Sequence, residues 1–103
     1  MVIIFFKMKV RPEKRKELSQ SLQSIVVQVR KESGCLDSGF YQNYENENEF
    51  LLVEEWASRE DSDAHQQSDL FAVLKGTGSL MQRPPEIEVH TVADLTELEI
   101  DKI

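Results

Sequence analysis

The segment at 34–71 constrains the fold of this 103-residue chain more than any other feature of the sequence. Two runs of strand-forming residues, 35–44 and 50–57, are separated by the polar residues 46–49, and this spacing predicts a β-hairpin. The second run carries apolar side chains on both faces, which is typical of a strand in the middle of a sheet. The hairpin is therefore expected to be one half of a larger sheet.

Two flanking segments supply the other strands of this sheet. Residues 2–10 alternate so that one face is wholly apolar, whereas the other face is apolar only at Ile3 and Phe5. Residues 86–93 alternate as well and predict the fourth strand. A sheet face that still carries Ile3 and Phe5 is expected to meet a partner, and the sheet of a second subunit is one candidate.

Helical signals occupy the gaps between these strands. Pro12 suits the first turn of a helix, and apolar residues recur after it at helical spacing, so a helix is expected over 12–32. Gly34 is expected to end this helix in the left-handed conformation. Ser58 and Ser68 are suitable N-caps for two further short helices. The apolar stripe of the first helix consists of Leu18, Leu22, Ile25, Val26 and Val29.

The order of these elements predicts an α+β, ferredoxin-like fold of the form β-α-β-β-α-β. Such a fold has a four-stranded antiparallel sheet with its helices on one face. We expect a single domain at 1–94, followed by a C-terminal tail at 95–103. The tail is acidic but carries four large apolar residues, so it either docks on a partner subunit or frays.

Composition argues against several classes of function. The chain has 19 acidic and 12 basic residues and a net charge of -7, which is unsuited to binding nucleic acid or an anionic membrane. It has no glycine-rich phosphate loop, no membrane-length apolar run, and no recognisable spacing of histidines and cysteines for a metal site. Cys35 is the single cysteine and is interpreted as a small buried hydrophobe. A cytoplasmic protein without a metal or a cofactor is expected.

His65 is the strongest candidate for proton transfer, because the pKa of a histidine lies near neutrality. The alternative is a partly exposed histidine that helps to end its helix. His90, on the last strand, is a weaker candidate and more typical of a packed or surface residue. Glu54 and Glu55 lie on opposite faces of one strand, so they do not form a catalytic pair. Whichever of the two points inward needs a partner for its carboxylate.

Aromatic side chains offer the material for a binding pocket. Trp56 is suited to form the wall of a site for a planar ligand. Phe6, Phe40, Tyr41 and Phe71 are candidates for the same wall. An apolar cavity beside Trp56, between the sheet and the helices, and an ordinary filled core are both compatible with this pattern.

Four short pieces of the chain, taken in their order and spacing, resemble the antibiotic biosynthesis monooxygenase (ABM) domain family. The resemblance covers about nine-tenths of the chain by element order and is more specific for the fold than for an activity. It implies a homodimer that forms a dimeric α+β barrel. The pieces are Gly34-Cys35, Val53-Glu54-Glu55-Trp56, Asp63-Ala64-His65 and Ser68-Asp69-Leu70-Phe71.

The resemblance also implies an activity. Similar family members oxidise phenols or quinols with O2 and need no metal or flavin, because a deprotonated, electron-rich aromatic substrate itself passes an electron to oxygen. On this basis the chain is expected to be a cofactor-independent monooxygenase of a quinol-like or polyphenolic small molecule. His65 would be its acid/base or hydrogen-bonding residue. The substrate-binding residues would be Trp56, Phe71, Tyr41 and Phe6.

The sequence departs from the family pattern at several positions. Many members have a histidine where this chain has Leu70, and a tyrosine where it has Ser38. The asparagine, tryptophan and histidine of the haem-degrading branch correspond to Phe6, His65 and approximately Lys75, so haem degradation is not expected. Two other functions therefore stay open. One is a non-enzymatic dimeric module that binds a small ligand, and the other is a structural dimer with a filled core.

Overall fold

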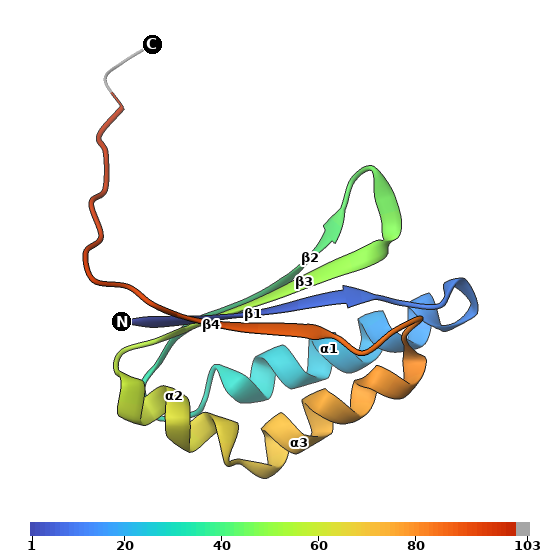
Figure 1. Cartoon of the computed structure of the whole chain (residues 1–103), viewed down its shortest axis with the longest axis horizontal. Coiled ribbons are helices and arrows are strands. Elements are labelled where there is room, and N and C mark those ends of the chain that lie inside the picture. The colour runs from blue at the N-terminus through green and yellow to red at the C-terminus, as the bar shows by residue number, and fades with distance from the viewer. Residues whose placement is uncertain (101–103) are drawn as a thin grey trace.

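A four-stranded antiparallel sheet forms one layer of the molecule, and helices cover one of its faces (Figure 1). The computed structural model describes residues 1–100. The strand order is β2-β3-β1-β4, so the two outer strands flank the hairpin strand β3 and the N-terminal strand β1. The predicted ferredoxin-like order is confirmed. The strands are β1 (Val2–Lys9), β2 (Cys35–Asn43), β3 (Asn46–Trp56) and β4 (Glu86–Thr91).

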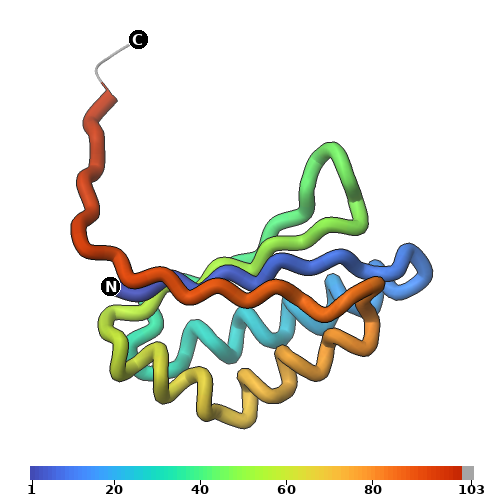
Figure 2. The backbone as a smooth tube through the Cα atoms, in the orientation of Figure 1, coloured from blue at the N-terminus to red at the C-terminus, as the bar shows by residue number. Residues whose placement is uncertain are grey.

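The helices all lie on the same side of the sheet, as the backbone trace in Figure 2 shows. The helix expected over 12–32 starts as a 3-10 turn at Pro12, and its α-helical part ends at Val29 rather than at residue 32. The backbone N–H groups of Lys31 and Glu32 donate to carbonyls three residues earlier, which tightens the chain out of the α-helix. The helical elements are η1 (Pro12–Lys14), α1 (Arg15–Val29), α2 (Arg59–Gln66), α3 (Asp69–Gly76) and η2 (Thr77–Leu80).

The hydrophobic core lies between the sheet and the helices and follows the predicted periodicities. Alternate residues of β1 face the helices and are almost fully buried, and the apolar stripe of α1 covers them. The prediction that β3 is a central strand is confirmed, because it pairs with both β1 and β2. The buried β1 residues are Val2, Ile4, Phe6 and Met8.

The hairpin turn lies two residues earlier than predicted. Tyr44 and Glu45 form the turn, and residues 46–49 belong to β3. The side chain of Asn43 accepts a hydrogen bond from the backbone N–H of Glu45 at 2.9 Å, which stabilises a tight turn at this point. The polar composition of 46–49 therefore reflects the exposure of this end of the hairpin, and not a loop.

The second face of the sheet is free of helices. Ile3, Phe5, Leu51 and Val53 lie on it and are half-buried. After β4 the chain leaves the sheet on the side opposite the helices, and its residues up to position 100 have no regular secondary structure (Figure 2). Three of the four apolar tail residues are exposed, and Ile103 lies outside the described residues. Between residues 1 and 100, no helix is long and apolar enough to cross a membrane.

Gly34 links the first helix to the second strand and also contacts the start of α2. Its φ of +80° confirms the predicted left-handed conformation. A Cβ atom at this position would overlap the side chain of Asp61. The hydroxyl of Ser58, the predicted N-cap, accepts from the N–H of Asp61 at 3.1 Å, and the N–H of Ala57 donates to the carbonyl of Gly34 at 2.8 Å. The turn and the helix therefore form one packed corner.

Replacing this glycine tests the corner. We expect Gly34→Ala to lower the free energy of unfolding by about 1–3 kcal/mol, because both the positive φ and the contact with Asp61 oppose a Cβ. Gly76→Ala is the matched control, since its φ is -62° and no atom lies within 4 Å of the added Cβ. Urea unfolding of both variants measures the difference. Equal effects of the two substitutions would contradict this account.

Candidate active site

His65 lies near the end of α2, and its ring is enclosed between the helices and the sheet. Only 2% of the residue is exposed, so it is not the partly exposed helix-ending residue of the alternative interpretation. The helix is mostly polar because most of its side chains face solvent, and its only buried residues are Ser62 and His65. Residues three apart lie on the same face of a helix, and this face is turned toward the sheet.

Two carboxylates flank the His65 ring. Nδ1 lies 2.7 Å from Oε2 of Glu32, which follows α1, and Nε2 lies 2.9 Å from Oε1 of Glu54, which is on β3. Glu54 is fully buried on the helix-covered face, so the prediction that an inward glutamate needs a partner is confirmed. Both contacts are within ion-pair distance, and opposite charge favours them when the ring is protonated. Three separate segments of the chain meet at one imidazole.

The environment of His65 favours its charged form. Burial by itself lowers the pKa of a histidine, and it is the largest single influence here. Glu54 and Glu32 act in the opposite direction and together outweigh burial, so the pKa of His65 is raised above its ordinary value of 6.5. The two carboxylates therefore favour an imidazolium here more than water does.

Three of the four predicted substrate-binding residues gather around this histidine. The Trp56 ring stacks on the His65 ring at a centroid distance of 4.4 Å and an angle of 26°. Phe71 approaches the His65 ring edge-on at 5.3 Å, and Phe6 packs against Phe71 at 5.5 Å. An aromatic face over an imidazolium adds a favourable electrostatic contact. The sequence motifs therefore do converge at one place.

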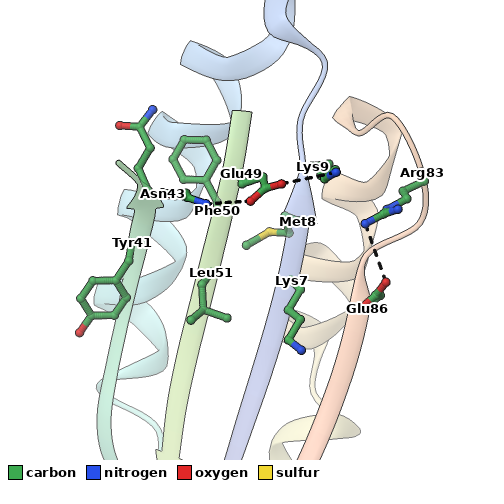
Figure 3. A pocket seen from close by; sticks show the side chains of 11 residues that line it. Lys7, Met8, Lys9, Tyr41, Asn43, Glu49, Phe50, Leu51, Arg83 and Glu86 are labelled. Carbon is green, nitrogen blue, oxygen red and sulfur yellow. Dashed lines mark hydrogen bonds and ion pairs between the residues drawn. The ribbon is translucent and has the colours of Figure 1, made fainter. Parts of the chain in front are cut away.

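Tyr41 lies elsewhere. It pairs with Leu51 across the hairpin, so its side chain is on the helix-free face and is 60% exposed. There it lines a cavity of about 430 Å³ above the sheet (Figure 3). Lys7 and Lys9 contribute to the same lining. His90 is also on the helix-free face, where its Nε2 lies 3.0 Å from Oε1 of Glu88.

The expected cavity beside Trp56 is closed in this structure. Trp56 and Phe6 are fully buried, and Phe71 is 6% exposed. Three surface cavities of about 430, 500 and 490 Å³ have linings that include neither Trp56 nor His65. A filled interior, one of the two possibilities left open by the sequence, is therefore what surrounds His65, and a ligand reaches the ring only if side chains move.

Glu32 and Ser38 lie at the site, although the sequence pattern did not predict either residue there. Glu32 is 33 positions before His65, and only the turn at Gly34 brings the two together, so no local spacing signals the contact. Ser38 pairs directly with Glu54 across the hairpin, and its buried hydroxyl has no hydrogen-bond partner among the described residues. Alternation within each strand, together with the hairpin pairing, places Ser38 and Glu54 on one face of the sheet. Alternation was the only sequence signal for the position of Ser38.

Comparison with known proteins identifies the family. Residues 1–75 match the sequence profile described as antibiotic biosynthesis monooxygenase (ABM). The chain belongs to the ABM family. Among its ABM-like relatives is YcnE, a provisionally named monooxygenase of Bacillus subtilis, which is 28% identical over 91 residues, or 88% of this chain and 96% of YcnE.

Solved structures agree with this assignment. A conserved protein from Methanosarcina mazei is 30% identical, with a TM-score of 0.80 and coverage of 86% of this chain and 89% of that one. A protein from Deinococcus radiodurans, named provisionally as an antibiotic biosynthesis monooxygenase, has a TM-score of 0.87 over 96% of this chain and 99% of its own. At 20% identity this second likeness is evidence for the fold.

The raised pKa of His65 predicts a pH dependence of stability. Because the folded pKa lies above the unfolded one, the ion pairs stabilise the native state fully below about pH 6.5, and this contribution is lost as the pH rises through the folded pKa. The stability of the wild-type chain relative to His65→Gln is therefore expected to decrease as the pH rises above about 6.5, the ordinary pKa of a histidine. Urea unfolding at several pH values measures this. A difference that does not vary with pH would contradict a raised pKa of His65 in the folded state.

Proposed function

We propose that this ABM-family protein is a cofactor-independent monooxygenase that oxidises a quinol-like or polyphenolic small molecule with O2. The observation that carries the proposal is the buried His65 ring between two carboxylates, inside an aromatic shell. Proton transfer is the chemistry that such a group performs. Family membership and the monooxygenase name of the relative YcnE support the same reaction class. The single cysteine fits a reducing, cytoplasmic setting.

The reaction needs only the substrate, O2 and a place for protons. Removal of the phenolic proton makes the ring electron-rich, and the phenolate gives one electron to O2, forming a substrate radical and superoxide. These two combine at a ring carbon that carries hydrogen, and a C–O bond forms. The peroxide then loses water: the O–O bond breaks, the ring C–H proton leaves, and a quinone remains. One oxygen atom enters the product and the other leaves as water.

The protein's part is to exclude water, orient the ring and manage the phenolic proton. Trp56 and Phe6 form the inner wall beside His65. Phe71 is the outer wall, with the Lys75 ammonium 5.3 Å from its ring centre. Substrate access is proposed to follow displacement of the Phe71 side chain, because it is the least buried of the aromatic residues around His65.

A specific observation favours the second candidate function, a non-enzymatic ligand-binding module. The cavity of about 430 Å³ beside Tyr41 is open in the structure, whereas the interior at Trp56 is closed. Its floor is partly apolar and includes Leu51, and its rim carries Lys9 and Arg83, which pair with neighbouring glutamates at 3.4 and 3.9 Å (Figure 3). A small aromatic ligand with a polar group would fit such a lining.

We further propose a homodimer in which the helix-free faces of two sheets meet. Ile3, Phe5, Leu51 and Val53 give this face an apolar centre, and a chain of this length gains buried surface from a second copy. The tail residues that follow β4 would then lie close to the partner, as the predicted docking requires.

Light scattering tests the homodimer. We expect a mass of about twice the 11.9 kDa of one chain at micromolar concentration. Phe5→Glu places a charge in the centre of the interface and is expected to shift the mass to that of one chain. Val27→Glu, at an exposed position of α1, is the control and leaves the mass unchanged. A monomeric wild-type chain would rule out the arrangement.

Oxygen consumption tests the enzymatic proposal. With a panel of hydroquinones and anthrols, we expect uptake above the spontaneous rate, and a decrease of about 10²-fold or more in His65→Ala because the proton-handling group is gone. His90→Ala removes the other histidine, on the helix-free face, and is the matched control. An unchanged rate in His65→Ala would remove this residue from the mechanism.

The same assay separates the two functions. Uptake catalysed by the wild-type chain excludes a purely binding role. If uptake never exceeds the spontaneous rate but an aromatic ligand raises the melting temperature, the binding module is favoured, since a ligand selective for the folded state stabilises it. If no aromatic ligand shifts the melting temperature either, a structural dimer with a filled core is favoured.

A further inference from the structure

The two nitrogens of His65 are both occupied, which limits what this residue itself does. Nδ1 faces Glu32 at 2.7 Å and Nε2 faces Glu54 at 2.9 Å. The Trp56 ring covers one face of the imidazole, and the edge contact with Phe71 closes another side. A phenolic hydroxyl therefore cannot reach a ring nitrogen unless it displaces a carboxylate. A group next to His65 has to meet the substrate.

Glu54 is such a group. Only its Oε1 lies at the imidazole, and its carboxylate is completely buried. Ser38 is paired with Glu54 across the hairpin, and the Cβ atoms of such paired residues are about 5 Å apart. Trp56 follows Glu54 by two residues on β3, so it lies on the same face of the sheet. The Ser38 hydroxyl and the Trp56 indole N–H are buried and have no hydrogen-bond partner within residues 1–100. One buried acceptor and two buried donors without a partner therefore occupy neighbouring positions on one face of the sheet.

This set of groups matches a phenolic oxygen. A phenol donates one hydrogen bond and accepts others, and buried polar groups are normally paired. The hydroxyl would donate to Glu54, and its oxygen would accept from Ser38 and Trp56. When the proton moves to Glu54, the two donors remain on the phenolate oxygen and stabilise its negative charge.

Glu32 provides the connection to solvent. Its side chain is 27% exposed, whereas that of Glu54 is fully buried. Once Glu54 takes a proton, the imidazolium loses one of its two negative neighbours and releases its Nδ1 proton to Glu32, which passes it to water. The number of protons is conserved: the phenol loses one, Glu54 gains one, and His65 delivers one to solvent. Other titratable groups near this site include the Cys35 thiol, on which the charges of Glu54, Glu32 and Asp37 act, and Lys75, whose ammonium group lies over the Phe71 ring.

We propose that Glu54 is the catalytic carboxylate that takes the phenolic proton, that Ser38 and Trp56 bind the phenolic oxygen, and that His65 and Glu32 are positioning residues that connect Glu54 to solvent. The proposal rests on the function stated above, because it names the contacts of that same site.

Binding of 4-nitrophenol tests the proposal independently of turnover, since the absorption of this phenol changes when it loses its proton. We expect the wild-type chain to bind and ionise it. Glu54→Gln is expected to bind it without ionising it, and Glu54→Asp to restore ionisation in part. Ser38→Ala is expected to weaken binding about 3–10-fold through the loss of one hydrogen bond. Glu55→Gln, on the same strand but the opposite face, is the control and behaves as wild type.

The role of Glu32 has its own readout. In Glu32→Gln, the pKa of His65, measured by NMR of the ring, is expected to fall. The rate of substrate oxidation is also expected to fall, and to recover as the buffer concentration rises, because buffer molecules then carry the proton to solvent. A purely structural role for Glu32 would give no recovery with buffer. Glu54→Gln is also expected to lower the pKa of His65, because each carboxylate favours the charged ring.

The outcomes separate this inference from the proposed function. If the wild-type chain catalyses oxygen uptake and folded Glu54→Gln does so at the same rate, the role of Glu54 is overturned while the function stands. If the wild-type chain ionises 4-nitrophenol through Glu54 but never consumes oxygen, the site stands and the monooxygenase function falls. Failure of the wild-type chain to bind the phenol overturns the site. If Glu54→Gln does not fold, Ser38→Ala with unchanged affinity overturns it.

Discussion

The contact between Glu54 and His65 is the interaction on which the rest of this structure depends. A carboxylate in the interior of a protein is very unfavourable unless an opposite charge or a donor meets it. β3 places Glu54 among the core residues, so the helix that follows has to bring a partner to it. α2 is short and polar, and its attachment to the sheet depends on a narrow buried face that includes His65. The ion pair therefore fixes the position of this helix as well as the chemistry of the site.

The corner at Gly34 completes the arrangement. It turns the chain from α1 into β2 close to the beginning of α2, where a side chain larger than hydrogen would meet Asp61. Glu32 sits just before this corner and thereby reaches the other nitrogen of His65. A residue with no other evident role becomes the solvent-side neighbour of a buried charge. The left-handed conformation of Gly34 therefore also determines which carboxylate lies next to the His65 ring.

The two faces of the sheet divide the functional possibilities. The helix-covered face holds the charged cluster in a closed aromatic shell, which suits a reaction that has to exclude water. The helix-free face carries an apolar centre and an open cavity beside Tyr41, which suits association or binding. A ferredoxin-like sheet with helices on one side leaves the second face available.

Much of the fold followed from the sequence, because alternation, helical spacing and caps are local properties. The order of the elements along the chain, the central position of β3, the left-handed Gly34 and the N-caps at Ser58 and Ser68 were all predicted and confirmed. The hairpin turn was misplaced, because exposed strand residues at 46–49 have the composition of a loop. Helix ends were less well predicted, since a 3-10 turn and an α-turn have similar local preferences.

The candidate site was only partly predictable, for a different reason. The sequence by itself determined that Trp56, Phe71 and Phe6 have the periodicity to face the interior, because this follows from the repeat of a strand or a helix. Only the tertiary structure decided that His65 and Glu32 join them, that Glu54 lies against His65, and that Tyr41 lies on the other side of the sheet. These outcomes depend on strand register and on how far the turn at Gly34 rotates the chain, and neither is encoded in the spacing of neighbouring residues.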